Sequence, residues 1–509
     1  MFIIVSLLVF INIVLLFLYS IWTYNYWMKK GVPYSHFTWG NFLDMILLRR
    51  SVADLISDLY RTGYGFPLLG YFEFCTPALL IRDPKLVKKV LVTDFHCFEE
   101  TGYGMDVKLD PLLARNPFAL CGKLWRAVRS LLTPGFTLYK VKNQFPLMAV
   151  ECREMIHYLE TEAPKYRPGG VEVKSLLRKF SVDVVVRCAF GVHGNSFSDP
   201  EAVFFKIGES FNEHGSWKQI RLILYNSLPK ILRSSFWDIN AQYFFLQLIK
   251  EIILYRERNR VFRNDYLHML MHIKRMGTIV KGRNIIRVGD VDIEYTDENI
   301  ASYALLLFFT GFHLPTCTLS FALYELASNP EVQTRLREEI DDVLMQHNGG
   351  LTYEAVEEMI YLDMVLKVTL RKYPPFHSIT RMCTKPYHLT LDSGRTILVE
   401  KGTAVVIPVE ALQNDPNHFP EPDLFDPGRF SEEQRVNVKP FTYLPYGAGP
   451  RQCFGMKFAD AEMKAGLVAI VSHFEIHRTE MTPATIEKDP CTITLDMKDS
   501  LWLDFVRRK

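Results

Sequence analysis

The sequence has no paired-cysteine pattern. Its 509 residues include nine cysteines, an odd number, and these are dispersed along the chain without any C-x-x-C pair. A disulfide framework in a small secreted protein needs an even set of cysteines, so that class of protein is excluded. The pattern is typical of a protein from a reducing compartment.

The chain also has little net charge. With 59 Lys and Arg against 57 Asp and Glu, its formal charge is +2, which does not favour nucleic acid as a partner. A composition of 48% hydrophobic and 23% charged residues excludes disordered and collagen-like chains. We find no repeat, no low-complexity tract and no linker, so the sequence predicts one body with a large core.

Charged side chains are missing from the first 28 residues. Residues 2–22 are apolar apart from two serines, Asn12 and Tyr19. About 20 residues at ~1.5 Å per residue cover the ~30 Å hydrocarbon core of a bilayer, so this segment is long enough to span a membrane. No later segment repeats an uncharged run of this length.

The flanks of this segment predict its orientation. Lys29 and Lys30 follow it, where a cytoplasmic flank would lie. We therefore predict a transmembrane anchor over residues 1–28 and a catalytic body over residues 29–509 on the cytoplasmic side. The alternative, a cleaved secretory signal, lacks the basic start and the small-residue cleavage site that it needs. The residues expected in an interfacial aromatic belt are Trp22, Tyr24, Tyr26 and Trp27.

Helical spacing of apolar residues dominates the body. Strands are few: residues 386–391 and 395–400 predict one hairpin, and residues 492–497 and 500–506 predict a second. The polar stretch 277–296 predicts a loop. The fold class is therefore mainly α with a minor β domain. The predicted helices cover residues 121–132, 143–162, 174–190, 238–275, 297–328, 330–346, 354–372 and 456–473.

The most informative segment is YLPYGAGPRQCFGM, residues 443–456. Cys453 lies between closely spaced glycines and directly before a helical pattern that begins near Gly455. Glycines let a backbone approach a flat ligand and adopt positive φ, and a helix amino terminus stabilises a thiolate. These are the requirements of a cysteine that binds iron, and Arg451 is placed to reach an anionic group of the same ligand. The alternative is a buried free cysteine in a turn.

This segment resembles the haem-binding loop of the cytochrome P-450 superfamily, F-x-x-G-x-R-x-C-x-G, with Tyr446 where phenylalanine is usual. The resemblance continues from about residue 31 and implies that family's fold, a helical triangular prism with a minor sheet domain, here preceded by one transmembrane helix. The positions that match the loop pattern are Gly449, Arg451, Cys453 and Gly455. Segments that resemble the insect microsomal type are residues 124–137, 321–340, 361–375 and 426–430.

The resemblance also implies a cofactor and the residues that bind it. The cofactor is haem b, with Cys453 as the axial thiolate ligand. Trp125 and Arg129 match a W-x-x-x-R motif whose side chains contact one haem propionate, and Arg381 resembles the arginine beside the second propionate. Arg451 and Gly455 are the remaining predicted cofactor-binding residues.

A partner and a location follow from the same resemblance. The family's microsomal members receive electrons from NADPH–cytochrome P-450 reductase, which docks on the cysteine side. Lys457 and the edge near Arg126 are candidates for that contact, although scattered surface charge explains each residue as well. The implied location is the endoplasmic reticulum membrane.

The match fails at the family's E-x-x-R motif. The glutamate would lie three residues before Arg371, where this sequence has Val368. In the family, this glutamate holds the helix arginine and the arginine of the P-x-R-F segment, here Arg429, in a buried triad behind the cysteine loop. Loss of one partner from a buried ion pair costs ~3–5 kcal/mol. We therefore expect a carbonyl or another carboxylate beside the two arginines.

The match also fails at the oxygen site. The family usually has A-G-x-E/D-T-T/S, in which the acid and the alcohol deliver protons, but residues 310–316 are TGFHLPT. His313 replaces the acid and Leu314 replaces the alcohol. Pro315 lacks the N–H that would bond the Gly311 carbonyl, which predicts a kink at 311–315.

Three residues of this turn are candidate catalytic residues. Thr310 lies one turn before Leu314 on the same helix face and offers a hydroxyl. His313, with an ordinary pKa of ~6.5, is a candidate proton carrier, or it packs without a catalytic role. Gly311 is the third candidate because it lies at the predicted kink.

Three functions remain open from the sequence. The first is a membrane-bound haem-thiolate monooxygenase that inserts one atom of dioxygen into a lipophilic small molecule with NADPH-derived electrons. The second is a haem-thiolate isomerase or dehydratase acting on a peroxide, suggested by the loss of the acid and the alcohol. The third is a catalytically impaired haem-binding protein, suggested by the missing glutamate. The identity of the substrate is not encoded in any motif.

Overall fold

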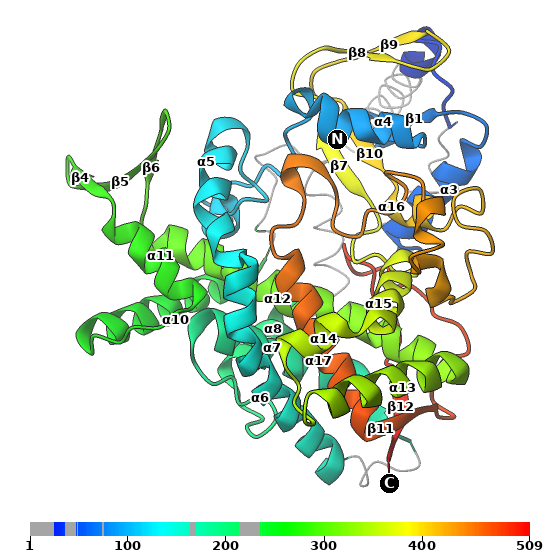
Figure 1. The fold of residues 1–509 in the computed structure, drawn as a ribbon. Coiled ribbons are helices and arrows are strands. Elements are labelled where there is room, and N and C mark those ends of the chain that lie inside the picture. Colours follow the sequence, from blue (N-terminus) through cyan, green and yellow to red (C-terminus); the bar gives the residue numbers. More distant parts are fainter. Residues whose placement is uncertain are drawn as a thin grey trace, which may run out of the picture.

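The computed structural model of the chain describes residues 25–35, 47, 49–73, 76–162, 169–212, 235 and 237–508. The predicted membrane segment 2–22 and two of the predicted belt residues, Trp22 and Tyr24, lie outside these residues. In the described part, helices form the bulk of the molecule and the sheets lie at its margins (Figure 1). The predicted class, mainly helical with small sheets, is confirmed.

The helices are named by their order in the chain. They are α3 (Val52–Thr62), α4 (Pro84–Lys88), α5 (Gly122–Leu132), α6 (Leu138–Glu162), α7 (Val173–Val185), α8 (Val203–Asn212), α10 (Ile239–Arg258), α11 (Tyr266–Arg275), α12 (Asp297–Ser328), α13 (Pro330–Gln346), α14 (Tyr353–Glu358), α15 (Ile360–Lys372), α16 (Val409–Gln413) and α17 (Met456–His473).

The strands form four small sheets. The largest has the order β1 (Leu68–Glu73), β2 (Thr76–Ile81), β10 (Ala404–Ile407), β7 (Ile379–Met382). The second joins β11 (Phe474–Arg478), β12 (Trp502–Arg507) and β3 (Val171–Glu172). The third is a meander of β4 (Thr278–Val280), β5 (Arg283–Val288) and β6 (Val291–Glu294), and the fourth is the hairpin of β8 (Tyr387–Thr390) with β9 (Thr396–Val399).

Helix α12 is the central element of the core. It begins at a capping box, in which the side chains of Thr296 and Asn299 each accept from the backbone of the other, and it ends where Asn329 and Pro330 start α13. Among the described residues it is the one helix long and apolar enough to span a membrane, but it is mostly buried inside the body. It is therefore the core helix of this fold.

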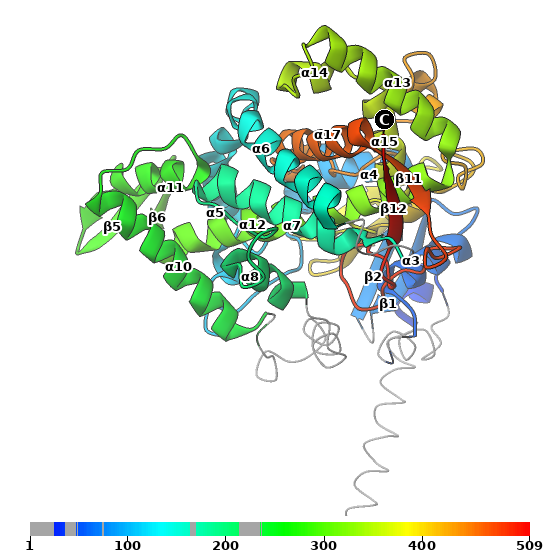
Figure 2. The ribbon, with the colours of Figure 1, turned by 90° about the horizontal axis from the view of Figure 1, so that it is seen from below.

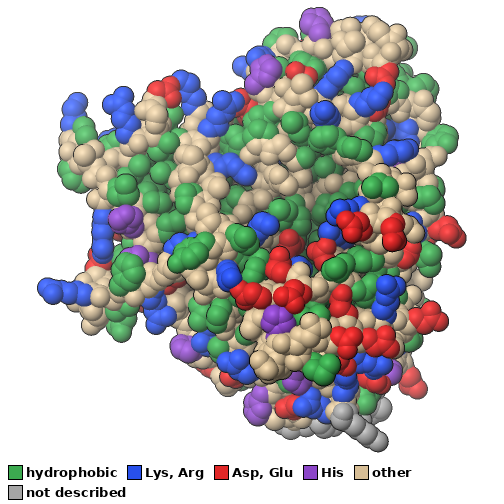
Figure 3. Space-filling model, viewed as in Figure 1, with side chains coloured by type: hydrophobic (Ala, Val, Ile, Leu, Met, Phe, Trp, Pro, Cys, Tyr) green, Lys and Arg blue, Asp and Glu red, His purple; other side chains and the backbone are tan. Residues whose placement is uncertain are grey.

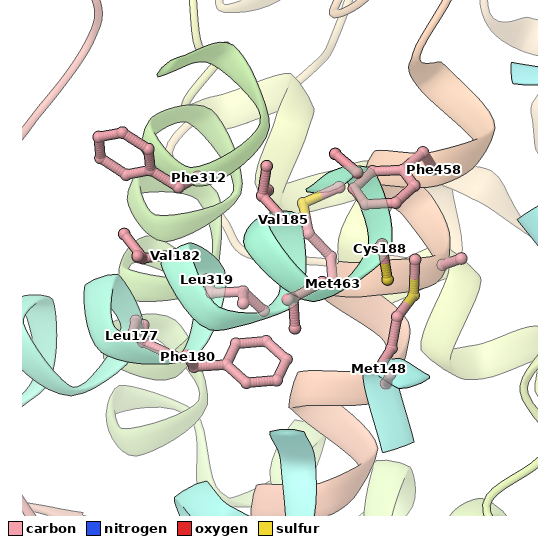
Figure 4. Close-up of a cluster of buried hydrophobic side chains, with 14 of the residues drawn as sticks. Met148, Leu177, Phe180, Val182, Val185, Cys188, Phe312, Leu319, Phe458 and Met463 are labelled. Carbon is pink, nitrogen blue, oxygen red and sulfur yellow. The ribbon is translucent and has the colours of Figure 1, made fainter. Parts of the chain in front are cut away.

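Helix α7 packs closely against α12 and α17 (Figure 4). Phe180, Val185 and Leu319 point into this contact and are buried. Gly311 and Gly466 allow the helices to approach, because a Cβ on either would lie 2.9 Å from Val185 and from Phe180, respectively. The tight packing fixes the position of α12 beneath the site described below.

Several predicted helices are confirmed and others are divided. The predictions for 297–328, 330–346 and 456–473 match the observed helices. The predicted helix 238–275 is instead two helices, because the chain leaves α10 at Arg260, whose φ is +53°, and restarts α11 at the cap residue Asp265. The predicted helix 354–372 is divided at Met359. The helices α3, α4 and α8 and the strands β1 and β2 were not predicted from the sequence.

One of the two predicted hairpins is present in the structure and the other is not. The hairpin predicted at 386–400 is confirmed as β8 and β9. The hairpin predicted between 492–497 and 500–506 is wrong, because β12 pairs with β11 on one side and with β3 on the other. The predicted loop at 277–296 is also wrong: it forms the meander β4–β6, which projects from the body beside α11 (Figures 1 and 2).

Trp27 belongs to the body and not to an interfacial belt. The residue is fully buried, its indole N–H donates to the Tyr71 carbonyl at 3.0 Å, and its ring lies against Gly70. The neighbouring Tyr26 hydroxyl donates to Glu400 at 3.1 Å. The body therefore includes residues that the sequence had assigned to the membrane interface.

Replacement of Trp27 by alanine tests this placement. We expect Trp27→Ala to lower the free energy of unfolding by about 3–5 kcal/mol, as for other buried aromatic truncations. The matched control is Met28→Ala, because Met28 is exposed, and we expect that change to stay within ~0.5 kcal/mol. Denaturant unfolding of both variants in detergent measures the difference. Equal midpoints for the two variants would contradict the placement.

Candidate active site

The loop before α17 is folded into a tight turn that presents Cys453. The Cys453 N–H donates to the Tyr446 carbonyl at 3.0 Å, and the Gly447 N–H donates to the Leu444 carbonyl at 3.0 Å. Gly447 and Gly449 have φ values of +70° and +73°, which favour glycine. These two turns of the backbone place Cys453 directly before the start of α17.

Gly449 is required by a close approach of two backbone segments. A Cβ at this position would lie 1.9 Å from the carbonyl oxygen of Leu91, which lies in the π-helical turn Lys89–Thr93. No side chain fits in that space, and the neighbouring backbone is held inside the core. The contact therefore fixes how closely the cysteine loop approaches the segment that follows β2.

The surroundings of Cys453 act on its thiol in opposite directions. Burial by the surrounding protein raises its pKa above the usual value, and the backbone N–H groups of Gly455 and Met456 and the Arg129 cation offset part of this rise. These N–H groups belong to the free amino terminus of α17, which stabilises negative charge. The Sγ atom faces a cavity, so the side chain remains accessible from that side.

This cavity lies between the cysteine loop and α12. Its open space, including the part that opens to solvent, is about 1650 Å³. Its wall is mainly apolar and aromatic, with contributions from Phe118, Leu307 and Phe376. In the described part of the chain, three arginines and no carboxylate line it: Arg129, Arg381 and Arg451.

Arg381 is the buried cation of this wall. It lies on β7 and is 6% exposed, and among the described residues its Nε has no hydrogen-bond partner. Burial, followed by the repulsion of Arg451, lowers its pKa to about 9. It remains a cation at neutral pH without an acidic partner, so an anion bound in the cavity would stabilise it.

Arg451 joins the cysteine loop to the opposite wall. Its guanidinium donates to the carbonyls of Glu99 (2.6 Å), Pro117 (3.2 Å) and Leu120 (2.7 Å) and lies 4.1 Å from the Trp125 ring centroid. Burial lowers its pKa to about 10. In this structure its donors are therefore largely occupied by backbone.

Arg129 and Trp125 lie on the α5 face that borders the cavity. The Arg129 guanidinium donates to the Gln452 carbonyl at 2.5 Å and lies over the Phe454 ring. The four predicted propionate contacts, Trp125, Arg129, Arg381 and Arg451, thus share one cavity with Cys453 and Gly455. The structure brings together all six residues that the sequence had assigned to the cofactor.

Helix α12 presents one predicted catalytic hydroxyl to the cavity. Thr310, Gly311, Leu314 and Pro315 line the wall, and the Thr310 hydroxyl donates to the Leu306 carbonyl at 2.7 Å. Position 315 has no N–H to offer the Gly311 carbonyl. The wall therefore carries a hydroxyl and a carbonyl where the family has an acid and an alcohol.

The structure does not bring His313 to the cavity. Its side chain is buried on another face of α12, where Nε2 lies 2.9 Å from the Thr494 hydroxyl and the ring stacks on Phe309. Cys317, one turn later, lies 3.9 Å from the same nitrogen. His313 joins α12 to the C-terminal segment in this arrangement and does not face the other candidate catalytic residues.

Arg371 donates its hydrogen bonds to groups other than the missing glutamate. Val368 is fully buried on α15, and Arg371 donates to the carbonyls of Gln413 (3.1 Å) and Pro422 (2.6 Å) and to the Asn414 side chain (3.0 Å). Burial, followed by the repulsion of Arg429, lowers the Arg371 pKa to about 10. Carbonyl groups have therefore replaced the acid.

Arg429 is held in the same way. It donates to the carbonyls of Pro420 (2.5 Å) and Glu421 (2.7 Å). The Nε atoms of Arg371 and Arg429 are both buried and have no hydrogen-bond partner in the described part of the chain. The pair thus retains two unused donors at the place where the family has a carboxylate.

Sequence reasoning missed several polar groups of this site, among them Thr318, Tyr103 and the hydroxyl of Tyr446. Thr318 and Tyr103 line the cavity. Thr318 was detectable, because it lies one helical turn after Leu314, whereas Tyr103 lies in an irregular segment. Tyr446, which stands where the family has phenylalanine, donates its hydroxyl to Asp460 and so joins the cysteine loop to α17.

The residues of the cavity fit a flat, dianionic cofactor with a metal centre. The sulfur atom of Cys453 lies at one wall, and the glycines beside it leave the adjacent surface without side chains. Three arginines of the lining supply positive charge. The orphaned Nε of Arg381 and the absence of an acid on the described wall match the charge of two carboxylates.

Comparisons with known proteins agree with this geometry. The chain matches the cytochrome P-450 family model over residues 31–501. It is 34% identical to cytochrome P-450 6k1 of Blattella germanica, over 97% of this chain and 95% of the relative. It is 36% identical to probable cytochrome P-450 6a13 of Drosophila melanogaster over 93% of each chain, and 33% identical to cytochrome P-450 6a2 of that fly over 99% of each.

The close approach at Gly449 gives a test of the loop. We expect Gly449→Ala to abolish most haem incorporation, since the new Cβ would collide with the Leu91 carbonyl. The control is Gly402→Ala, which has the same left-handed strain (φ +89°) but nothing within 4 Å. Soret absorbance per mole of purified protein measures the result. A similar loss in both variants would show that backbone strain, and not the contact, is responsible.

The two unused arginine donors give a second test. We expect Val368→Glu to raise the yield of haem-bound protein. We also expect it to raise the free energy of unfolding by about 1.5–3 kcal/mol, because the new carboxylate would accept from the unpaired Nε atoms of Arg371 and Arg429 and hydrogen bonds to charged groups contribute this much. Val368→Gln, of the same shape without the charge, is the control. If Glu gives no gain over Gln, the carbonyl groups have fully replaced the acid.

Proposed function

The chain belongs to the cytochrome P-450 family, whose members are monooxygenases that hold haem b through a cysteine thiolate, and we propose that Cys453 is that ligand in this protein. The observation that carries the proposal is the position of Cys453. Its sulfur lies at the amino terminus of α17, in a glycine turn, and faces a cavity lined by three arginines.

The arginine rim holds the propionates in this proposal. Arg381 supplies its unpaired Nε, and Arg129 and Arg451 supply the charge of the opposite side, with Trp125 stacked against Arg451. Gly455 keeps the surface beside the sulfur free of a side chain. When bound, the haem supplies the redox chemistry that activates dioxygen, and the protein supplies protons, position and exclusion of water.

Proton delivery is assigned to Thr310 with the Gly311 carbonyl. The Thr310 hydroxyl keeps acceptor capacity after donating to Leu306, and the Gly311 carbonyl lacks its helical N–H because of Pro315. Thr310 and Gly311 both line the cavity, and in this proposal the hydroxyl and the carbonyl together hold a water molecule that passes protons inward. His313 has no part in this step, because its nitrogen is bonded to Thr494.

The substrate is a lipophilic small molecule in this proposal. The cavity wall above the cysteine is built mainly from aliphatic and aromatic side chains, which bind apolar ligands by burial of surface. Electrons come from NADPH through a membrane-bound reductase. The uncharged residues 2–22 anchor the body to the cytoplasmic side of the endoplasmic reticulum membrane, because this segment is long enough to span it.

The alternative is an isomerase or dehydratase that acts on a peroxide substrate. Leu314 and Pro315 line the cavity where the family has an alcohol and its neighbour, and a rearrangement needs neither a proton relay nor a reductase. The third function, an impaired haem protein, is disfavoured because carbonyl groups hold Arg371 and Arg429 in place of the acid.

One reconstitution experiment separates these functions. The haem-bound protein is combined with NADPH–cytochrome P-450 reductase in phosphatidylcholine vesicles, and NADPH consumption, product and released hydrogen peroxide are measured. We expect NADPH-dependent product from the wild type. We expect Cys453→Ser to lose the reduced carbon monoxide band of a thiolate-ligated haem. Turnover of a lipid peroxide without NADPH, and none with it, would favour the isomerase.

The assignment of Thr310 is tested in the same system. We expect Thr310→Val to lower product per NADPH by roughly tenfold or more, with electrons lost as hydrogen peroxide, since a positioned proton-transfer group contributes ~10²–10⁴-fold. The control is Thr316→Val, because Thr316 is buried and donates to the Leu177 carbonyl away from the cavity. Equal coupling in both variants would remove Thr310 from the mechanism.

A further inference from the structure

A polar contact between distant parts of the chain lies inside the core. On the face of the molecule in Figure 3, Lys, Arg, Asp and Glu side chains lie at the surface among apolar ones. His313 and Thr494, by contrast, are each only 5% exposed, and His313 Nε2 lies 2.9 Å from the Thr494 hydroxyl. Polar groups are stable inside a core only when they are hydrogen-bonded. The contact therefore selects one position of the C-terminal chain relative to α12.

The ring of His313 is itself held in place by its neighbours on α12. It stacks on Phe309, with ring centroids 5.3 Å apart and an interplanar angle of 16°. Phe309 in turn packs edge-on against Trp237 at 4.5 Å. The Cys317 sulfur, one helical turn after His313, lies 3.9 Å from the same Nε2 atom. The ring is therefore a fixed point against which the C-terminal chain is placed.

Thr494 belongs to a closed turn of the chain, residues 487–498, which we call the C-terminal turn. Its two ends are joined twice, because the Lys498 N–H donates to the Glu487 carbonyl at 2.9 Å and the two side chains form an ion pair at 2.7 Å. Near the tip, the Thr492 hydroxyl donates to the Thr494 carbonyl at 2.6 Å. These bonds make the turn a unit that moves as one piece.

The C-terminal turn is attached to the body near both of its ends. Lys488 forms ion pairs with Glu410 of α16 at 2.5 Å and with Asp54 of α3 at 3.1 Å. On the other arm, the buried Asp496 pairs with Lys174 of α7 at 3.1 Å. The tip between these attachments is placed by contacts of its own, of which the bond to His313 is one.

The residue after Thr494 supports the wall of the cavity. The Leu495 N–H donates to the Pro375 carbonyl at 2.9 Å, and the Leu495 side chain is buried. Pro375 and Phe376 line the cavity, where Phe376 stacks on Phe118, with ring centroids 6.2 Å apart. A displacement of Thr494 would therefore reach the cavity wall through a single peptide unit.

We propose that His313 is a positioning residue that sets the shape of the substrate cavity. It acts through Thr494 and Leu495 on the wall at Pro375, and it does not touch the substrate. This inference rests on the function proposed above, because it assumes that the cavity holds haem and a substrate. A wall held in one position is a preformed surface for a ligand large enough to reach it. Substrates are therefore selected by size through a contact outside the cavity.

The test removes the contact from each side. Thr494→Val keeps the shape of the side chain and removes its hydroxyl, and His313→Leu removes the ring nitrogen. In the double variant, two residues that act through each other give no further loss. The matched control is Thr482→Val, because Thr482 is also buried but its hydroxyl donates to the Trp502 carbonyl at 2.6 Å. Neither residue of the control contact lines the cavity.

Two nitrogen ligands of haem iron serve as probes of the cavity. They are imidazole, and clotrimazole, in which three aromatic rings are attached to an imidazole. Dissociation constants are measured from the Soret shift of the haem-bound protein. We expect both single variants and the double variant to bind clotrimazole about fivefold more weakly, the effect of one neutral hydrogen bond on an equilibrium, and imidazole within about twofold of the wild type. Thr482→Val should bind both probes as the wild type does.

Denaturant unfolding of the same proteins separates positioning from stability. Thr494→Val and Thr482→Val each lose one buried hydrogen bond, so we expect both to be destabilised alike. Clotrimazole binding that is unchanged in Thr494→Val, or weakened as much in Thr482→Val, overturns the proposal. Additive losses in the double variant, or an equal weakening of imidazole, also overturn it, because the effect would then not pass from His313 through Thr494 to the wall.

Probe binding needs no turnover, so this inference and the proposed function fail separately. The expected clotrimazole result without any NADPH-dependent product would keep the positioning role of His313 and refute the monooxygenase assignment. NADPH-dependent product together with unchanged clotrimazole binding in the variants would do the reverse.

Discussion

The contact between Gly449 and the Leu91 carbonyl is the constraint on which the site depends. It allows the cysteine loop to lie directly on the segment after the first sheet, and the hydrogen bond from the Cys453 N–H to Tyr446 then sets the direction of the sulfur. Both interactions are between backbone atoms. The position of the thiol is therefore determined by the fold, whereas its charge is adjusted by Arg129 and the start of α17.

Two groups of residues have changed around this fixed loop. Behind it, carbonyl groups hold Arg371 and Arg429, so the support has become a network of neutral acceptors. Above it, α12 presents Thr310, Leu314 and Pro315 to the cavity, so the wall has a hydroxyl but no acid. Behind the loop, the dipoles hold the two arginines less strongly than a carboxylate would, but they avoid the cost of burying an acid.

The sequence predicted those features that local signals specify. The helix 297–328 has a capping box at its start and Pro330 after its end, and the cysteine loop has its glycines. Other features depend on distant contacts: β12 pairs with strands remote in the chain, and the break of the predicted helix 238–275 follows from an arginine in a left-handed conformation. For His313 the sequence left a proton carrier and a packing role open, because spacing along a helix does not show which neighbour lies across from each face; in the structure the side chain contacts Thr494 and does not line the cavity.

The sheet formed by β3, β12 and β11 joins the middle of the chain to a late segment. Val171 and Glu172 pair with Trp502 and Leu503, and Phe474 pairs with Arg507. During synthesis, β3 leaves the ribosome long before its partner β12 exists, whereas β11 lies close to β12 in the chain. The sheet can close only after residue 507 has emerged, so a nascent chain exposes the unpaired edge of β3 to chaperones while the intervening helices are synthesised.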